Sequence, residues 1–308
     1  MSVPVMEQTV WLPIRFGYKT LAEPKRRMQV LKLHFTEIRP EHVSALIDEH
    51  PEEDCLIRAL PIDAPLPRIS RFQGRLRFVQ RQYQRHYIDL TTTWDDYQAR
   101  FSPKTLQGMR RKLRKFERES GGTIDWRTYR TPEEMETFYR LAREVSSRTY
   151  QERLLDAGLP TEETFRQRMI ERAAEGRVHG YLLFLHDAPI AYLYCPVDDG
   201  ILEYAYLGYL QEHATLSPGT VLQWLVVEAL YGEGGYRMFD FSAGEGAHKA
   251  MFGKDSLCCA DVFLLQPTGA NRLLVYAQAF VSTTSSFASR VLNRLQLKAH
   301  VKRLIRQT

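Results

Sequence analysis

The segment Ser217-Pro218-Gly219-Thr220 has the residue types and spacing of an anion-binding site. It lies between a predicted strand over residues 201–210 and a predicted helix. The first amides of a helix have no partner inside the helix, and the helix dipole is positive at that end, so both attract an anion. Gly219 has no side chain, so a ligand could approach the backbone closely, and a pyrophosphate would fit there without a lysine. The simpler interpretation is an ordinary capped helix start, because Ser-Pro is common at such positions.

A second group of polar side chains lies at or after the ends of two predicted strands, over residues 201–210 and 237–241. The group consists of Glu203, Tyr206, Asp240, Ser242, Glu245, His248 and Lys249. Carboxylates, imidazole and amine groups gathered at one edge of a sheet could move protons or hold a polar substrate. Three of them also have a plainer interpretation: Glu203 as an exposed strand residue, Asp240 as a turn or helix cap, and Lys249 as a solvated surface charge.

Several other kinds of chemistry lack their motifs. The sequence contains no HExxH, no Cys/His group with zinc spacing, no GxxxxGK[ST], no GxSxG and no GxGxxG after a strand. We therefore expect no bound metal. The cysteines Cys55, Cys195, Cys258 and Cys259 form no CxxC pair, and reduced thiols in a cytoplasmic protein are the expectation. No secretory signal or membrane-spanning segment is predicted.

The elements around these residues predict a mixed α/β fold. Residues 178–186 and 189–197 are predicted strands of a hairpin, and residues 201–210 are a third strand. A helix from Pro218 buries Leu222, Leu225, Val226 and Ala229, and strands over 237–241 and 259–265 follow. A helical crossover joins the strands over 201–210 and 237–241, so we expect these two to be neighbours and parallel.

The region before residue 178 is predicted to be strand-rich at first and helical later. Residues 1–90 contain short apolar runs broken by proline and glycine, which indicate strands and turns. Ser102-Pro103 opens a helix whose apolar stripe is Leu106, Met109, Leu113 and Phe116. The rest of that helix carries many lysines and arginines. Thr131-Pro132 opens another helix.

The net charge of +5 conceals three blocks of opposite sign. Residues 1–120 carry +7, residues 121–261 carry −9, and residues 262–308 carry +7 with no acidic residue. A chain that is basic, acidic and basic in turn is not a generic nucleic-acid binder. The acidic middle block would favour a cationic partner, and the two basic blocks need separate explanations.

The segments HDAPIAYLY, LSPGTVLQWLVVEAL and YRMFDFSAGEGAHKAMFG occur in an order that resembles the GNAT acyltransferase superfamily. The likeness is strongest to the CelD-like acetyltransferase branch of bacterial envelope and exopolysaccharide gene sets. That branch is related in fold to Fem-type peptidoglycan aminoacyltransferases. The segment YIDLTTTWDDYQARFSPKTLQGMRRKLRKFERESGG resembles the same branch, so the likeness covers roughly residues 75–265. The usual GNAT pyrophosphate motif is absent, and Ser217-Pro218-Gly219 stands in its place.

The resemblance implies an α/β fold with a mixed sheet of the GNAT acyl-CoA N-acyltransferase type. We expect three regions: an N-terminal α/β region over residues 1–120, itself a candidate second GNAT-like domain, a catalytic domain over 121–265, and a basic helical tail over 266–308. The resemblance further implies acetyl-CoA or a longer acyl-CoA as donor and a small-molecule amine as acceptor, with an envelope-related sugar, lipid precursor or amino acid as the expected class.

The resemblance also implies roles for particular residues. Ser217, Gly219, Thr220 and Val221 would bind the donor pyrophosphate. Glu203, Tyr206 and Asp240 would be catalytic, with Glu203 as general base, and Ser242, Glu245, His248 and Lys249 would face the acceptor. Backbone amides between the strands over 201–210 and 237–241 would polarise the thioester carbonyl.

The two basic segments keep several interpretations open. The helix after Ser102 is either a packed helix with a solvated face or an anion site for the CoA 3′-phosphate, an acidic glycan, a lipid headgroup or tRNA. Its only aromatic residue, Phe116, lies on the apolar stripe, which weakens the tRNA reading. In the tail, basic residues recur every four positions over 290–306. That ridge would dock on the acidic block, contact an anionic inner-membrane surface, or stay unstructured.

Three functions remain at this stage. The preferred one is a cytoplasmic N-acyltransferase that moves an acyl group from acyl-CoA to an amine by direct attack on the thioester. The first alternative is a Fem-type transferase that uses aminoacyl-tRNA. The second is a non-catalytic adaptor that keeps the fold and binds lipid or another polyanion.

Overall fold

The computed structural model describes residues 3–16, 19–149, 158–244 and 246–294, and the chain divides into two compact units. Unit 1 comprises Met1–Gln84 and Leu257–Thr308, and unit 2 comprises Arg85–Ser256. The chain passes between them within β7 (Arg75–Asp89) and β14 (Asp255–Leu265). This division differs from the expected ranges 1–120, 121–265 and 266–308, because the basic helix belongs to unit 2 and most of β14 to unit 1.

Unit 1 contains a mixed sheet and two helices. Its remaining elements are β1 (Val5–Trp11), β2 (Ile14–Phe16), β3 (Lys19–Ala22), β4 (Lys25–Leu31), α1 (Pro40–Glu49), β5 (Cys55–Pro61), β6 (Ile69–Phe72) and α9 (Gly269–Arg294). The strand order is β1-β4-β5-β14, in which only β4 and β5 are parallel. The strand-rich prediction missed α1, which buries Val43, Leu46 and Ile47.

Unit 2 contains the segments that carry the chemically interesting residues. Its helices are α2 (Trp94–Ala99), α3 (Pro103–Glu119), α4 (Pro132–Ser147), α6 (Glu163–Ala174), the 3₁₀ helix η1 (Gln211–Leu216), α7 (Pro218–Glu233) and α8 (Ala247–Phe252). Its strands, besides the end of β7, are β8 (Trp126–Tyr129), β9 (Val178–Leu185), β10 (Ala188–Asp198), β11 (Ile201–Glu203), β12 (Tyr206–Tyr209) and β13 (Met238–Asp240). The order β7-β13-β11-β10-β9-β8 is antiparallel except for the parallel pair β11 and β13. The predicted mixed α/β fold is confirmed.

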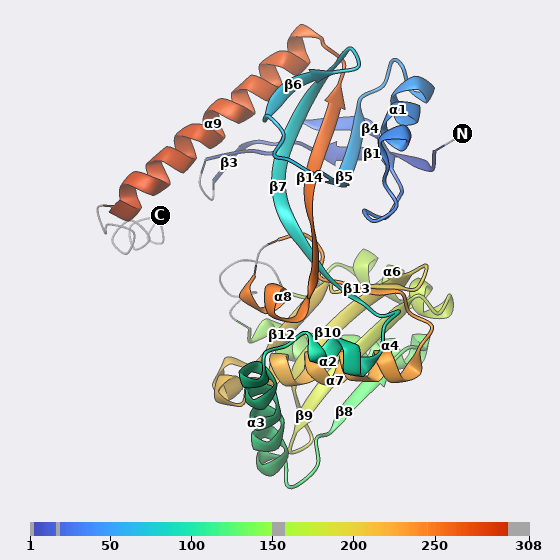
Figure 1. Ribbon diagram of the computed structural model, residues 1–308, viewed down its shortest axis with the longest axis vertical. Coiled ribbons are helices and arrows are strands. Elements are labelled where there is room, and N and C mark those ends of the chain that lie inside the picture. Colours follow the sequence, from blue (N-terminus) through green and yellow to red (C-terminus); the bar gives the residue numbers. More distant parts are fainter. Residues whose placement is uncertain (1–2, 17–18, 150–157, 245, 295–308) are drawn as a thin grey trace. The chain divides into compact units, whose positions relative to one another are not determined.

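Both faces of the central strands of unit 2 are covered. Seven of the eight residues of β9 and a run of six consecutive residues in β10 are buried, whereas a sheet with one face in water would alternate. Helices α4 and α6 pack against β9, and α7 packs against β9, β10 and β12. Figure 1 shows α7 in front of these strands and α4 behind them. The sheet edge that carries Glu203 and Asp240 is therefore supported by a packed core on both sides.

Helix starts in unit 2 follow the predicted chemistry with one exception. The Ser102 hydroxyl accepts from the Thr105 amide, and the Thr131 hydroxyl accepts from the Glu134 amide, as caps do. Ser217 also precedes a helix, but its φ is 54° and its side chain makes no cap hydrogen bond. The simpler interpretation of an ordinary capped helix start therefore holds for the positions of Ser217 and Pro218 but not for the side-chain cap, because Ser217 lies in the left-handed region.

The predicted third strand is divided in two. The sequence from Ile201 to Leu210 is continuously strand-like, but Tyr204 and Ala205 separate β11 from β12. Residues 201–203 pair with 238–240 of β13, whereas residues 206–209 pair with 191–194 of β10. The chain thus leaves β13 after Glu203 and continues along β10 alone. The predicted parallel neighbours are confirmed for the first three residues only.

A buried histidine in unit 2 predicts acid sensitivity. His179 lies among Tyr181, Tyr236 and Arg130, and burial lowers its pKa from 6.5 to about 4. Between pH 6.5 and 4 this histidine therefore binds a proton in the unfolded chain but not in the folded chain. The free energy of unfolding consequently falls as the pH drops from 6.5 toward 4. We expect a loss of about 3 kcal/mol by the time the pH is below 4. Urea unfolding across this range should show the loss, and His179→Gln should flatten it. An equal slope in both proteins would contradict the assignment.

Candidate active site

The parallel strands β11 and β13 separate between two consecutive residues. The opening that forms between them is the candidate site. The Tyr204 amide donates to the Asp240 carbonyl oxygen at 2.8 Å, which is the last backbone link to β13. The next amide, of Ala205, donates to the Tyr194 carbonyl oxygen of β10 instead, at 3.2 Å. Among the described strands, β12 pairs with β10 alone. Backbone polar groups on the other edge of β12 are therefore available to a ligand that lies between the parting strands.

Glu203 ends β11 directly beside the opening and opposite Asp240. Its side chain is exposed, yet the protein around it reduces the hydration of the carboxylate and raises its pKa. The negative charge of Asp240 adds to that rise, while Arg85 and Arg172 oppose it. Contact with solvent limits the size of the rise. An accessible carboxylate with a raised pKa has the properties of a general base that works near neutral pH.

Asp240 is held in a different way. It is 2% exposed, and its carboxylate accepts hydrogen bonds from the Arg85 guanidinium at both oxygens. Its Oδ1 also accepts from the Ser242 amide at 2.9 Å, which forms a turn of the Asx type. A carboxylate occupied by a guanidinium and an amide is a poor proton acceptor. These contacts fix the end of β13. They agree with the plainer interpretation of Asp240 as a turn residue.

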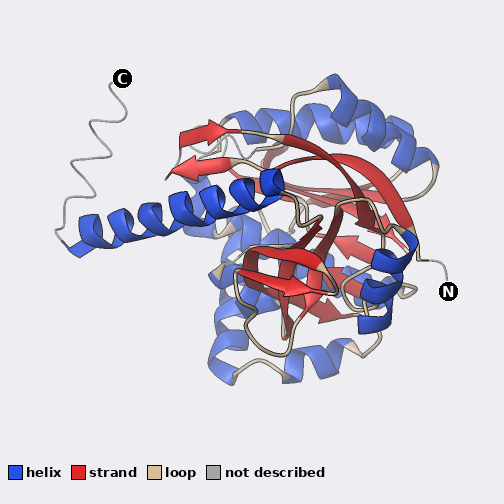
Figure 2. Ribbon diagram, turned by 90° about the horizontal axis from the view of Figure 1, so that it is seen from above, coloured by secondary structure: helices blue, strands red, loops and turns tan. Residues whose placement is uncertain are grey.

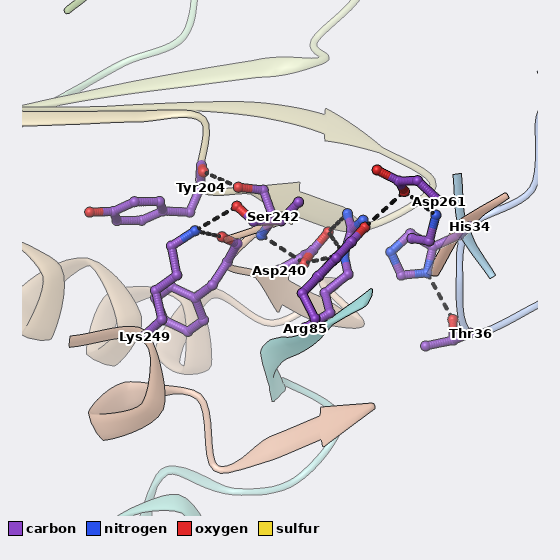
Figure 3. A network of polar contacts seen from close by, with 12 residues as sticks. His34, Thr36, Arg85, Tyr204, Asp240, Ser242, Lys249 and Asp261 are labelled. Atoms are coloured by element: carbon purple, nitrogen blue, oxygen red, sulfur yellow. Dashed lines mark hydrogen bonds and ion pairs between the residues drawn. The ribbon is translucent and has the colours of Figure 1, made fainter. Parts of the chain in front are cut away.

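Lys249 belongs to α8, and its side chain contacts the loop after β13. Its Nζ donates to the Phe241 carbonyl oxygen at 2.7 Å and to the Ala243 carbonyl oxygen at 3.1 Å. Burial lowers its pKa, and Arg85 contributes in the same direction while Asp240 opposes it. Figure 3 shows the side chain reaching from α8 to this loop, with Ser242 beside it. Lys249 is thus no solvated surface charge; it holds the loop between β13 and α8 in place.

The other predicted acceptor-side residues are partly brought together. The His248 Nε2 lies 3.4 Å from the Tyr204 hydroxyl, and burial lowers the pKa of His248, with Lys249 adding to the effect. The Ser242 hydroxyl donates to the Tyr204 carbonyl oxygen at 3.4 Å, across the point where the strands part. Glu245 lies outside the described residues. Ser242, His248 and Lys249 therefore surround the same strand ends as Glu203.

Tyr206 begins β12 on the far side of the opening from β13. Its ring packs edge-on against Phe165, with centroids 5.8 Å apart, and is half-buried. Burial raises its pKa and the charge of Glu203 raises it further, so the hydroxyl stays protonated at neutral pH. A protonated phenol beside the opening could donate a hydrogen bond or a proton to a departing anion.

The N-terminus of α7 retains two amides that the helix does not use. Pro218 has no amide hydrogen, and the Val221 amide donates to the Ser217 carbonyl oxygen at 3.0 Å. The amides of Gly219 and Thr220 therefore remain as donors at the positive end of the helix dipole. The Val221 side chain is fully buried. Of the four predicted donor-binding residues, Gly219 and Thr220 thus offer backbone groups, and Val221 contributes packing.

Gly219 is needed for packing as well. A Cβ at this position would lie 3.1 Å from Leu207 Cδ2 and 3.2 Å from Tyr209 Cδ1, both on β12. The sequence analysis ascribed this glycine to close approach of a ligand, whereas the structure shows close approach of β12. The absence of a side chain allows the start of α7 to lie directly against the edge of the opening.

Two glycines of α7 make a matched pair for a test. A Cβ at Gly232 meets nothing within 4 Å, so Gly232→Ala should stabilise the protein by up to ~1 kcal/mol through helix propensity. Gly219→Ala should lose that gain, because Leu207 and Tyr209 must move, and it should weaken several-fold the binding of the acyl-CoA donor that the sequence predicts. Thermal unfolding and calorimetry measure both effects. Equal donor affinity in the two variants would show that the start of α7 takes no part in binding.

The basic helix α3 lies next to this helix start. The Lys115 Nζ donates to the Thr215 carbonyl oxygen of η1 at 3.0 Å. Among the described residues, Lys104, Arg110, Arg111, Lys112 and Arg114 form no ion pair. An open cavity of about 400 Å³ runs beside the helix, lined by Phe101, Pro103, Leu106, Gln107, Arg110 and Arg114. Unneutralised positive charge therefore lies along α3 up to η1, directly before the two amides of α7.

Sequence reasoning missed Arg85, which completes the site. Its partner Asp240 is 155 residues away, and only the pairing of β7 with β13 brings them together. A buried aspartate predicts some cationic partner, but no local signal distinguishes Arg85 from the other arginines. Within the described ranges there is also no group of three or more His, Cys, Asp or Glu side chains placed to hold a metal ion.

Comparisons with known proteins agree with this geometry. A sequence model of the acetyltransferase (GNAT) domain matches residues 103–250. No curated protein sequence matches the chain. Among solved structures, the C-terminal domain of a candidate lysylphosphatidylglycerol synthetase from Agrobacterium fabrum has a TM-score of 0.53 at 12% identity, covering 91% of this chain and 89% of that chain. FemX has a TM-score of 0.50 at 11% identity, covering 84% of this chain and 89% of that chain.

The low sequence identities limit what these similarities show. Identities of 11–12% show a shared fold and nothing about substrates. The matched segment runs from the start of α3 into α8 and includes the parting strands and the start of α7. The narrower likeness to the CelD-like branch stays a prediction. Residues 103–250 of this chain thus match the sequence model of an acetyltransferase domain of the GNAT superfamily.

Proposed function

We propose that this chain is an N-acyltransferase that moves an acyl group from acyl-CoA to an amine. The observation that carries the proposal is the parting of β11–β12 from β13 at Glu203, within a domain of the GNAT superfamily. An opening between parallel strands offers backbone groups to a thioester carbonyl and places an accessible carboxylate at its edge. Direct transfer needs these two features and no covalent enzyme intermediate.

The reaction can be written with the residues at the opening. The amine nitrogen attacks the thioester carbonyl carbon, and a C–N bond forms as the carbonyl oxygen gains negative charge. Backbone amides on the edge of β12 would stabilise that oxygen. Glu203 takes a proton from the amine nitrogen, the C–S bond breaks, and the thiolate of CoA leaves. A proton from Tyr206 or solvent neutralises the thiolate, so the products are an amide and the free thiol.

Donor binding would use the start of α7 and the basic helix beside it. The Gly219 and Thr220 amides are suited to the pyrophosphate of CoA. Lys115, fixed near Thr215, and the unpaired arginines of α3 would add attraction for the phosphate groups. The acceptor would enter from the side of Ser242, His248 and Lys249. An amino group on an envelope-related sugar, lipid precursor or amino acid is the acceptor class that the family resemblance suggests.

Calorimetry with acetyl-CoA and with longer acyl-CoAs tests this proposal. We expect saturable binding at micromolar to millimolar ligand, with weaker binding in Gly219→Ala than in Gly232→Ala. A thiol-release assay against a panel of amines then identifies the acceptor. Absence of binding by any acyl-CoA at millimolar concentration would overturn the proposal. Binding without thiol release in any amine would leave the donor site supported and the acceptor class open to a wider panel.

A second candidate donor is aminoacyl-tRNA, which the basic face of α3 favours. Five lysines and arginines there form no ion pair within the described part of the chain. Phosphate backbones bind such surfaces with a strong salt dependence. Gel-shift experiments with charged and uncharged tRNA test this reading, with Arg110→Ala and Arg114→Ala as variants. Transfer that requires charged tRNA and proceeds without acyl-CoA would replace the first proposal.

A further inference from the structure

Helix α9 of unit 1 has one face fixed against the rest of its unit. Val275 is fully buried, and the Gln278 Nε2 donates to the Leu12 carbonyl oxygen at 3.0 Å. Asn271 Nδ2 donates to both carboxylate oxygens of Asp54 at 3.3 Å. These three residues follow a spacing of four and three, so they define one side of the helix. Figure 2 shows α9 as one long, uninterrupted helix.

The side of α9 opposite to this packed face is apolar and exposed. Leu273 is 74% exposed, Tyr276 is 59% exposed and Phe280 is 70% exposed. Their spacing of three and four places them on one stripe, and position 287, seven residues after Phe280, is again a phenylalanine. Among the described residues these three are the most exposed large apolar side chains. Such a stripe on a helix is a surface for contact rather than for water.

The charge around this stripe indicates what it contacts. No charged residue occurs from Leu273 to Ser289, and residues 262–308 contain seven basic and no acidic residues. Apolar and aromatic residues followed by acid-free positive charge have the composition of helices that lie at the surface of anionic bilayers. No helix in the described ranges is long and apolar enough to cross a membrane. The helix would therefore lie along the surface.

We propose that α9 docks on the surface of an anionic lipid bilayer. Leu273, Tyr276 and Phe280 enter the boundary between headgroups and acyl chains, while Asn271, Val275 and Gln278 keep the helix attached to unit 1. The basic residues beyond Ser289 add electrostatic attraction to the headgroups. This inference concerns unit 1 and does not depend on the reaction proposed for unit 2.

Sedimentation of the full chain with lipid vesicles tests the proposal. Vesicles of phosphatidylcholine alone are compared with vesicles that also contain about one third phosphatidylglycerol. We expect binding to the anionic vesicles that is at least tenfold stronger and that weakens in high salt. The combined substitutions Leu273→Ser, Tyr276→Ser and Phe280→Ser should reduce binding at least tenfold, because they remove the apolar contacts without changing the charge.

The matched control is Met6→Ser, which removes an exposed apolar side chain of β1 in the same unit. It should bind vesicles as the unaltered chain does, and circular dichroism should show both variants folded. The proposal is overturned if the unaltered chain does not bind anionic vesicles, or if the triple variant binds them as strongly as the unaltered chain does. It is also overturned if light scattering shows a dimer that only the triple variant loses, since the stripe would then join two copies.

Discussion

Glu203→Gln is expected to lower kcat about a hundredfold or more and to leave KM for acyl-CoA nearly unchanged. Glutamine keeps the shape of the side chain but cannot accept the amine proton, and general-base catalysis contributes roughly 10²–10⁴-fold to rates. Glu203 belongs to β11, whereas the proposed donor site uses two backbone amides of α7, so the variant removes none of the groups assigned to donor binding. Steady-state assays of thiol release measure both constants.

The pH dependence of kcat/KM is a second, independent test of Glu203 as the general base. A base must be ionised to act, so activity should rise with pH through the pKa of Glu203, and surroundings raise that pKa above the ordinary value. The acid limb of kcat/KM should therefore lie above the usual range for glutamate, about 4.3. In Glu203→Gln this limb should vanish along with most of the activity.

Stability supplies the control for that variant. A carboxyl whose pKa is raised by folding holds its proton more tightly in the folded chain, so it favours folding at low pH and loses that benefit as the pH rises. Glu203→Gln should thus unfold at the same or a slightly higher temperature at pH 7. Full activity in this variant, or a lower unfolding temperature with all activity lost, would remove the case for Glu203 as the base.

Much of the framework of unit 2 could be predicted from local signals. The caps at Ser102 and Thr131 mark helix starts because a hydroxyl there satisfies an amide that the helix leaves unpaired. The hairpin of β9 and β10 follows from two apolar runs around a tight turn. These features depend on residues close in sequence, so one sequence suffices to find them.

The features that make the site depend on residues far apart. The break at Tyr204-Ala205 has no local signal, because the strand-like pattern continues through it and two different partners, β13 and β10, decide where it falls. The same holds for Gly219. The sequence predicts that its missing side chain makes room for a ligand, whereas in the structure it makes room for Leu207 and Tyr209. The division into two units is also invisible locally, since β7 and β14 are single continuous strands that serve both.

The role of Asp240 can be decided by experiment, because the two interpretations predict different losses. Asp240→Ala should destabilise the protein by about 3–5 kcal/mol, since it removes the buried carboxylate that accepts hydrogen bonds from the largely buried guanidinium of Arg85. The melting temperature should fall by roughly 10 °C. Asp125→Ala, which breaks the exposed ion pair with Arg127, should cost at most about 1 kcal/mol and serves as the matched control.

A double substitution separates the cost of a stranded charge from the loss of a reacting group. Arg85→Met combined with Asp240→Leu removes both charges and fills their space with apolar atoms, so it should recover much of the stability that Asp240→Ala loses. If Asp240 only anchors β13, the double variant should also recover activity, because Glu203 and the start of α7 stay in place. Restored stability with activity still absent would instead assign Asp240 to the reaction, as its position at a strand end first suggested.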